Sequence, residues 1–174
     1  MKRFLIGILA VGLLSLIAER GVAQSNPRDT AKLDLGGKTV SVEYGRPSLK
    51  GRSVSEMLGR LKPGSFWRLG ADQSTTFSTA VDLVFGHVTI PSGEYSLWVE
   101  RGPNNTWRLV FNKQHGQWGT QHDVSKDFAS APLKETKAPD SAEMVTINLS
   151  QEGTGGVIAI QWGDMKLTAS FKAK

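Results

Sequence analysis

The sequence contains no cysteine and only three histidines. Without cysteine, no disulfide framework can hold the fold and no lipobox cysteine is available for lipid attachment. Stability must therefore come from the burial of apolar side chains and from strand pairing. At 174 residues, the chain has room for one domain with a proper hydrophobic core.

Runs of basic residues are also missing. The formal net charge is +5, and the charged residues of the N-terminal leader contribute about +2 of it. The remaining basic residues are scattered along the chain rather than clustered, which is not typical of nucleic-acid binding. We therefore expect no nucleic-acid partner.

Only one long apolar run is present, and it lies at the N-terminus. Two basic residues precede an apolar stretch over residues 4–18, and a small-x-small pattern ends at Ala23. This arrangement predicts a signal peptide over residues 1–23, cleaved near Ala23. A retained anchor is the alternative, although the run is shorter than the ~20 residues that span a membrane. We expect an exported protein, periplasmic or secreted, with no membrane span after cleavage.

Alternation of apolar and polar residues dominates the rest of the chain. After a polar, flexible lead-in at residues 24–31, the segment "KTVSVEYG" places Val40, Val42 and Tyr44 on one face. Glycine-, proline- and asparagine-rich turns separate the later segments. The pattern predicts one all-β domain over residues 32–174, an antiparallel β-sandwich or flattened, jelly-roll-like barrel. The later strands are expected at residues 87–90, 94–100, 106–112, 143–150, 156–162 and 166–172.

One stretch, "SVSEMLGRLKPG", is typical of a short helix. Ser53 and Glu56 have the spacing of a capping box, and Pro63-Gly64 stops the helix. Two longer irregular segments, residues 46–71 and 112–128, interrupt the strands. Long loops in a compact β domain commonly carry function, so we expect any site there, with both segments at the same end of the fold.

Several blocks of the sequence occur in a combination typical of one family. They are "EYGRPSLKGRS", "FWRLGADQSTTF", "IPSGEYSLWV", "WRLVFNK", "WGTQHD" and "IQWGDMKL". In this combination the chain resembles the bacterial domain-of-unknown-function family numbered 2911, over nearly the whole mature sequence. The resemblance implies an exported bacterial protein and supplies no reaction.

One position departs from the family pattern. Where the family usually shows asparagine and then glutamate, this chain has Asp72 and Gln73. Position 73 therefore has an amide, which cannot serve in a role that needs a carboxylate there.

Arginines are the first candidates for binding. If the two irregular segments meet, Arg46, Arg52 and Arg68 face one place, where guanidinium forks suit an anionic or sugar-like ligand. The structural alternative is that Arg46 and Arg68 pair with carboxylates, Asp72 among them, and hold the loop against the sheet.

Tryptophans divide into two groups by position. Trp67 lies beside a strand and is expected in the core, as are most of Trp98, Trp107 and Trp162. Trp118 lies between two glycines in the second irregular segment. It serves either as a stacking platform for a sugar ring or as a plug for the open end of the sandwich.

His122 and Asp123 are candidates for acid–base chemistry. They supply a metal site only if Asp72 and Asp127 converge on them, and none of the dense ligand spacings of metal sites is present. We therefore predict no metal and no cofactor.

Three hypotheses for the function remain open. The first is a module that binds a small polar or anionic ligand, such as a saccharide. Its predicted ligand-binding residues are Arg46, Arg52, Trp67, Arg68, Asp72, Trp118, His122 and Asp123. The second is a structural or partner-binding envelope protein. The third is a hydrolase that uses Asp72 and His122.

Overall fold

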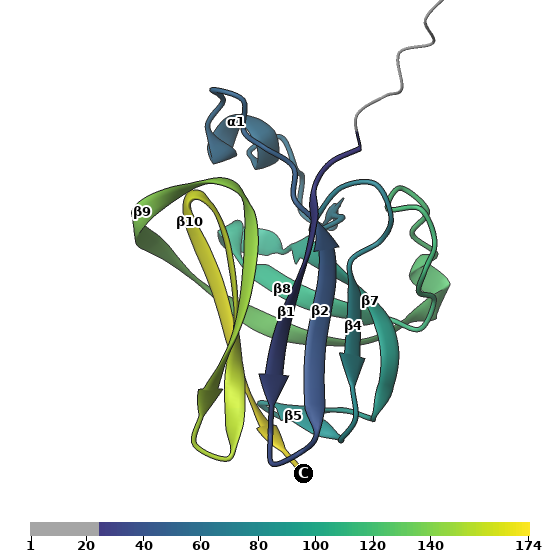
Figure 1. Ribbon diagram of the computed structural model, residues 1–174. Helices are drawn as coiled ribbons and strands as arrows, with labels where there is room; N and C mark the ends of the chain where they lie inside the picture. Colours follow the sequence, from purple (N-terminus) through teal and green to yellow (C-terminus); the bar gives the residue numbers. More distant parts are fainter. Residues whose placement is uncertain (1–24) are drawn as a thin grey trace, which may run out of the picture.

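The computed structural model describes residues 25–174, so the predicted signal peptide lies outside the described residues. The strands form one antiparallel sheet in the order β1-β2-β4-β7-β8-β9-β10-β5-β6, with β3 also paired to β7 (Figure 1). The strands are β1 (Arg28–Asp34), β2 (Thr39–Gly45), β3 (Phe66–Trp67), β4 (Thr76–Thr79), β5 (Leu83–Phe85), β6 (Val88–Ile90), β7 (Gly93–Arg101), β8 (Trp107–Asn112), β9 (Asp127–Glu152) and β10 (Gly155–Ala173). The helical segments are α1 (Val54–Leu58) and the 3-10 turns η1 (Pro103–Asn105) and η2 (Val124–Lys126).

The prediction of an all-β, antiparallel domain with one short helix is confirmed. Within residues 25–174, α1 is the single α-helix, and the ten-stranded sheet folds over without closing into a barrel. In β2, alternation works as expected, because Val40, Val42 and Tyr44 are buried and the residues between them are not.

The first strand begins earlier than the sequence indicates. Residues 28–31, which the sequence assigns to a flexible lead-in, belong to β1 and pair with β2 from Arg28 opposite Gly45 to Asp34 opposite Thr39. The assignment of residues 28–31 to a lead-in was therefore wrong. As the last strand at one end of the sheet order, β1 has no further strand to pair with in the described residues and is largely exposed. Its apolar residues, Ala31 and Leu33, alternate with polar ones and pack against the core.

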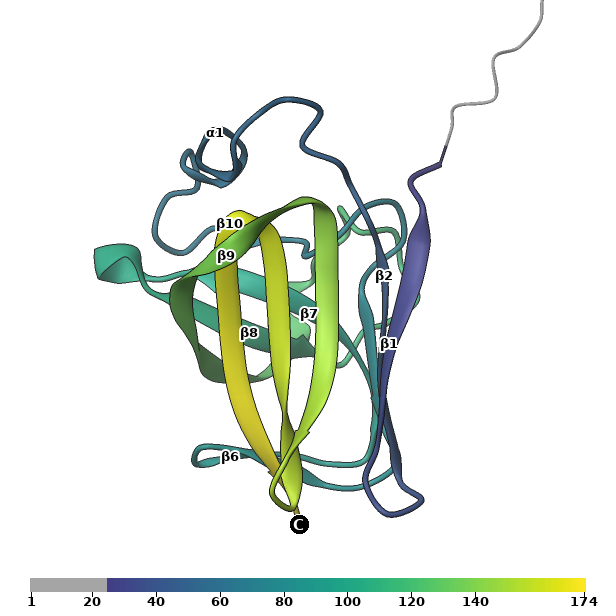
Figure 2. The same cartoon turned by 60° about the vertical axis from the view of Figure 1, so that its left-hand side comes forward.

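Two long strands connect the two halves of the sheet. The first part of β9 pairs with β8, and its remainder pairs with β10, so the chain crosses from one layer to the other within a single strand (Figure 2). The expected strands at 156–162 and 166–172 are both part of β10. Gly163, which the sequence indicates as a turn, instead lies in a bulge with a φ of 57°. A bulge bends a strand without ending it, so the turn expected there was wrong.

Residues 44–49 join the two layers by binding β9. The Tyr44 hydroxyl accepts a hydrogen bond from the Ile147 N–H (2.9 Å) and donates one to the Ile147 carbonyl (3.3 Å). Further along, the Val145 N–H donates to the Pro47 carbonyl and Ser48 forms a bridge with Met144. These contacts give hydrogen-bond partners to backbone groups of β9, although residues 44–49 are not part of a strand paired with β9.

Aromatic side chains fill the space between the layers. Trp67 from β3 stacks on Trp162 from β10 with ring centroids 5.7 Å apart. Lower in the core, Phe111 contacts the rings of Phe77 and Phe85. The four tryptophans in or beside strands are all buried, as expected, whereas Trp118 is 50% exposed.

The predicted capping box is present at the start of α1. The Ser53 hydroxyl accepts from the Glu56 N–H, and the Glu56 carboxylate accepts from the Ser53 N–H, which lowers the pKa of Glu56. Gly59 caps the other end, before the Pro63-Gly64 stop that the sequence suggests. Figures 1 and 2 both place α1 over one end of the sheet, next to the bends within β9 and β10. The helix therefore covers that end of the core.

We predict that Tyr44→Phe lowers the free energy of unfolding by about 1–3 kcal/mol, because it leaves two buried backbone groups of Ile147 without a partner. Tyr95→Phe is the matched control. Its hydroxyl donates only to the Pro91 carbonyl, so we expect a loss of about 1 kcal/mol or less. Urea unfolding of both variants tests this, and equal losses would contradict the role assigned to Tyr44.

Candidate functional site

The two irregular segments meet at one end of the sheet. The Ser74 N–H donates to the Gln117 carbonyl (2.9 Å), the Gly119 N–H donates to the Asp72 carbonyl (2.7 Å), and Gln73 forms a bridge with Trp118. Residues from both segments also line one pocket. The expectation that they lie at the same end is therefore confirmed.

The chain leaves the sheet between β3 and β4 and makes a strained excursion. Both strands pair with the same edge of β7, and residues 68–75 bulge away between them. Leu69 is fully buried with a φ of 50°, a left-handed conformation that costs about 1–2 kcal/mol in a residue with a side chain. The Thr75 hydroxyl holds this conformation by donating to the Leu69 carbonyl (2.6 Å). Strain of this kind is commonly stored beside functional sites.

Glycine at position 45 permits the close approach of this excursion to β2. A Cβ atom added to Gly45 would lie 2.2 Å from the Ala71 carbonyl oxygen, which is far inside contact distance. The block that starts at Glu43 and the block that starts at Phe66 are thus packed backbone to backbone. Their neighbouring side chains are brought to one place by this contact.

A pocket of about 560 Å³ lies at this end, within the size range of small-molecule sites. Its walls are mainly apolar. Aromatic rings from the sheet form one wall, and residues of and after α1 form another. The aromatic residues are Phe66, Trp67, Trp98 and Trp162, and the helix side supplies Met57, Leu58 and Leu61. The charged and titratable side chains in the lining are those of Arg68 and His122.

Arg68 is an unpaired cation in this pocket. Within the described residues, its guanidinium has neither a hydrogen-bond acceptor nor a carboxylate within ion-pair distance. Asp72 does not reach it, because that carboxylate accepts from the Asn26 N–H (2.8 Å) and side chain. The expected internal pairing of Arg68 with Asp72 is therefore not formed.

His122 lines the same pocket as Arg68 and is held by several contacts. Its ring stacks on Trp98 with centroids 4.1 Å apart, and it meets the edge of Phe66 at 4.4 Å. Nε2 lies 2.8 Å from the Asp127 carboxylate, and the side chain is only 9% exposed. The partner of His122 is thus Asp127 and not Asp72, the residue that the hydrolase hypothesis pairs with it.

Trp162 contributes a second unused polar group. Its indole N–H is the one buried side-chain nitrogen or oxygen without a partner in the part of the chain that the structure describes. A buried donor without an acceptor is unfavourable by about 1–3 kcal/mol. Trp162 lines the pocket, but this nitrogen is itself buried and is not exposed to it.

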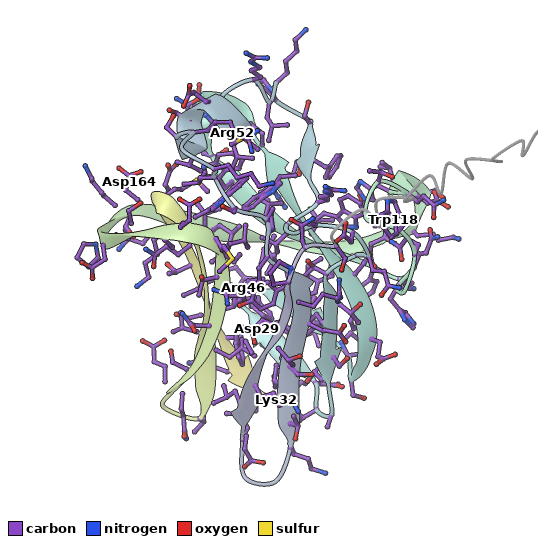
Figure 3. All side chains as sticks on the ribbon, turned by 45° about the horizontal axis from the view of Figure 1, so that its top comes forward. Asp29, Lys32, Arg46, Arg52, Trp118 and Asp164 are labelled. Atoms are coloured by element: carbon purple, nitrogen blue, oxygen red, sulfur yellow. The ribbon has the colours of Figure 1, made fainter. Side chains whose placement is uncertain are left out.

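Two of the predicted arginines lie elsewhere. Arg46 is a strut: its guanidinium donates to the Val145 carbonyl and the Thr146 hydroxyl (3.1 Å each) and pairs with Asp29 at 3.3 Å. Arg52 is exposed and donates to the Leu49 carbonyl. Neither side chain lines the pocket of Arg68, and Figure 3 shows them at separate places on the molecule.

Trp118 and Asp123 also lie outside the pocket lining. The exposed Trp118 is separated from Arg52 across the end of the molecule (Figure 3). Asp123 caps η2: its carboxylate accepts from the hydroxyl and N–H of Ser125, and these hydrogen bonds lower its pKa. Of the eight predicted site residues, the structure brings Trp67, Arg68 and His122 together around one pocket.

A second pocket, of about 490 Å³, lies on the other side of α1. Its charged groups are already satisfied. Arg101 lies over the Trp107 ring at 4.1 Å, the Trp107 N–H donates to Glu135, and Lys137 pairs with Asp164. Unlike the pocket of Arg68, it presents no unpaired group to a ligand.

Residues that the sequence did not single out complete the site. Trp98 was expected only in the core, yet it forms the surface on which His122 stacks. Asn112 is fully buried, and its amide donates to the Asp127 carboxylate at 2.7 Å. No group of three metal-ligating side chains gathers within residues 25–174. Nor is any helix of the described residues long and apolar enough to cross a membrane.

Comparison with protein-family models matches residues 26–171 to the family "Protein of unknown function (DUF2911)". The chain belongs to this family. No curated protein and no solved structure matches the sequence. The family resemblance noted from the sequence blocks is therefore confirmed, and it brings no assigned activity.

Position 72 has a backbone conformation that favours only a few residue types. Asp72 has a φ of 61°, which asparagine and aspartate tolerate better than other residues with side chains. We predict that Asp72→Ala lowers the free energy of unfolding by about 1–2 kcal/mol, whereas Asp72→Asn changes it by less than about 0.5 kcal/mol. Gln73→Ala, at an exposed neighbour, is the control. Urea unfolding measures all three, and a large loss in the asparagine variant would show that the charge itself is required.

Proposed function

We propose that this protein is an exported module that binds a small anionic ligand in the pocket lined by Arg68 and His122. The observation that carries the proposal is the unpaired guanidinium of Arg68 in a pocket with mainly apolar walls. A cation near apolar surface is stabilised by a partner of opposite charge, and none is supplied by the described residues. A ligand carboxylate or phosphate supplies that partner through two parallel hydrogen bonds.

The walls of the pocket favour a ligand with an apolar face. Four aromatic side chains line the pocket around Arg68, and rings of this kind pack against the C–H faces of sugars and other cyclic compounds. The combination supports a cyclic or short-chain acid, such as an acidic saccharide fragment.

Other charged residues of the family blocks support a structural role. Arg46 and the Glu143 carboxylate both join residues 46–50 to β9, and hydrogen bonds from Ser48 and the Lys50 N–H lower the pKa of Glu143. These contacts support a structural role for Arg46 and Glu143, as the envelope-protein hypothesis expects. They do not involve Arg68, whose place in a pocket supports ligand binding.

Export is the second part of the proposal. The supporting observation is the leader sequence over residues 1–23. When the full chain is expressed in a bacterium, we expect the soluble protein recovered from the periplasm or medium to begin at Gln24. Intact-mass measurement checks this, and protein that retains residues 1–23 in the membrane fraction would contradict it.

Ligand binding is testable by thermal unfolding in the presence of matched compounds. We expect glucuronate, succinate or inorganic phosphate to raise the Tm, with glucose as the neutral counterpart of glucuronate. Ligand at 100 times its Kd adds about 2.7 kcal/mol to the free energy of unfolding. Arg68→Gln should abolish the shift because it removes the charge and the fork of donors.

Arg52→Gln is the matched control, because this exposed arginine lies outside the pocket lining. It should leave the shift intact. Equal stabilisation by glucose and glucuronate, or an unchanged shift in Arg68→Gln, would refute anion binding at this site.

A further inference from the structure

The pocket contains a histidine that is oriented as a base. Nε2 of His122 faces the Asp127 carboxylate at 2.8 Å, whereas Nδ1 has no partner within residues 25–174. An ionised carboxylate only accepts hydrogen bonds, so in a neutral His122 ring this contact favours the tautomer with the proton on Nε2 and the lone pair on Nδ1. The ring is nine-tenths buried and lines the pocket.

A chain of hydrogen bonds fixes this orientation. The buried Asn112 side chain donates to both the Asp127 carboxylate (2.7 Å) and the Asp123 carbonyl (2.8 Å). Asn112 in turn accepts from the Gln114 N–H. Asn112 and His122 both contact Oδ1 of Asp127, so Asn112 fixes the carboxylate that orients the His122 ring. A carboxylate that orients a histidine base is the arrangement used in acid–base catalysis.

The second ring nitrogen of His122 is open to water. Within residues 25–174 Nδ1 has no protein partner, and it is not one of the buried polar atoms left without one, so a water molecule can reach it. The ring packs against Trp98 and Phe66 and lines the pocket that also contains the unpaired Arg68. The strained segment that carries Arg68 adds a second feature typical of active sites.

We infer that this pocket hydrolyses a small anionic carboxylic ester, with His122 as the general base, Asp127 as its positioning residue and Arg68 as the anion-binding group. The inference rests on the proposed binding of an anion. Water is the nucleophile, because the chain has no cysteine and the hydroxyl side chain in the lining, Thr120, is exposed and forms no hydrogen bond with His122.

In the first step, Nδ1 of His122 takes a proton from water as the water oxygen forms a bond to the ester carbonyl carbon. The carbonyl π bond breaks and its electron pair moves to the oxygen, giving a tetrahedral oxyanion. In the second step, the oxyanion re-forms the carbonyl, the bond to the alkoxide oxygen breaks, and the imidazolium returns its proton to that oxygen. The products are a carboxylic acid and an alcohol, and His122 is regenerated.

The test compares two activated esters. Mono-4-nitrophenyl succinate carries a carboxylate, and 4-nitrophenyl acetate is its neutral counterpart. We expect the wild-type protein to hydrolyse the anionic ester with the higher kcat/KM. Arg68→Gln should raise KM for the anionic ester, so that the preference for the anionic ester over the neutral one is lost.

His122→Gln is the decisive variant. The glutamine amide still donates to Asp127 but lacks the basic nitrogen, so we expect kcat to fall by about 10²–10⁴-fold. Asp127→Asn should lower kcat with little change in KM, which a merely structural role would not produce. His115→Gln, at an exposed histidine outside the pocket, should leave both constants unchanged.

Binding and turnover are separable in this design. Succinate raises the Tm of His122→Gln as it does that of the wild type if the variant is folded and the anion site is intact. Hydrolysis that persists in folded His122→Gln, or no hydrolysis by a wild-type protein that succinate stabilises, would overturn the catalytic inference and leave the proposed binding in place. If succinate, glucuronate and phosphate all fail to stabilise the wild type, the proposed function fails first.

Discussion

The docking of residues 44–49 on β9 is the contact on which the rest of the structure depends. A cysteine-free sheet of ten strands that does not close into a barrel has only burial and hydrogen bonds to keep its layers together. Tyr44 and Arg46 supply hydrogen bonds to Ile147 and Val145 of β9. This joint sets the spacing of the layers, and with it the stack of Trp67 on Trp162 at the base of the pocket.

Sequence alternation revealed the strands that bury one face and expose the other. β2 belongs to this class, whereas the middle of β7 and most of β8 are buried on both faces. All three predicted ranges agree with the structure within about two residues. The start of β1 escaped detection because residues 28–30 are all polar and exposed, and the apolar face of the strand is limited to Ala31 and Leu33. The first half of β9 escaped because it changes partner strands and contains prolines, which turn rules interpret as loop.

Part of the site was also predictable. Arg68 and His122 stand out as polar residues among aromatic ones, and the two segments that carry them do converge. What the sequence could not supply was the choice of partners. Arg46 and Arg68 look alike in the family blocks, yet one is fully paired and the other is not. That difference depends on which carboxylate reaches which guanidinium, and only the folded backbone decides it.

The strain at Leu69 ties the pocket to the fold. A continuous strand from β3 to β4 along β7 would form regular ladder hydrogen bonds without any left-handed residue. The chain instead makes the excursion, with Leu69 buried in an unfavourable conformation and locked by Thr75. A regular strand would remove the break that carries Arg68 to the pocket. By itself the excursion is less favourable than a regular strand. Its structural consequence is that Arg68 and His122 line the same pocket.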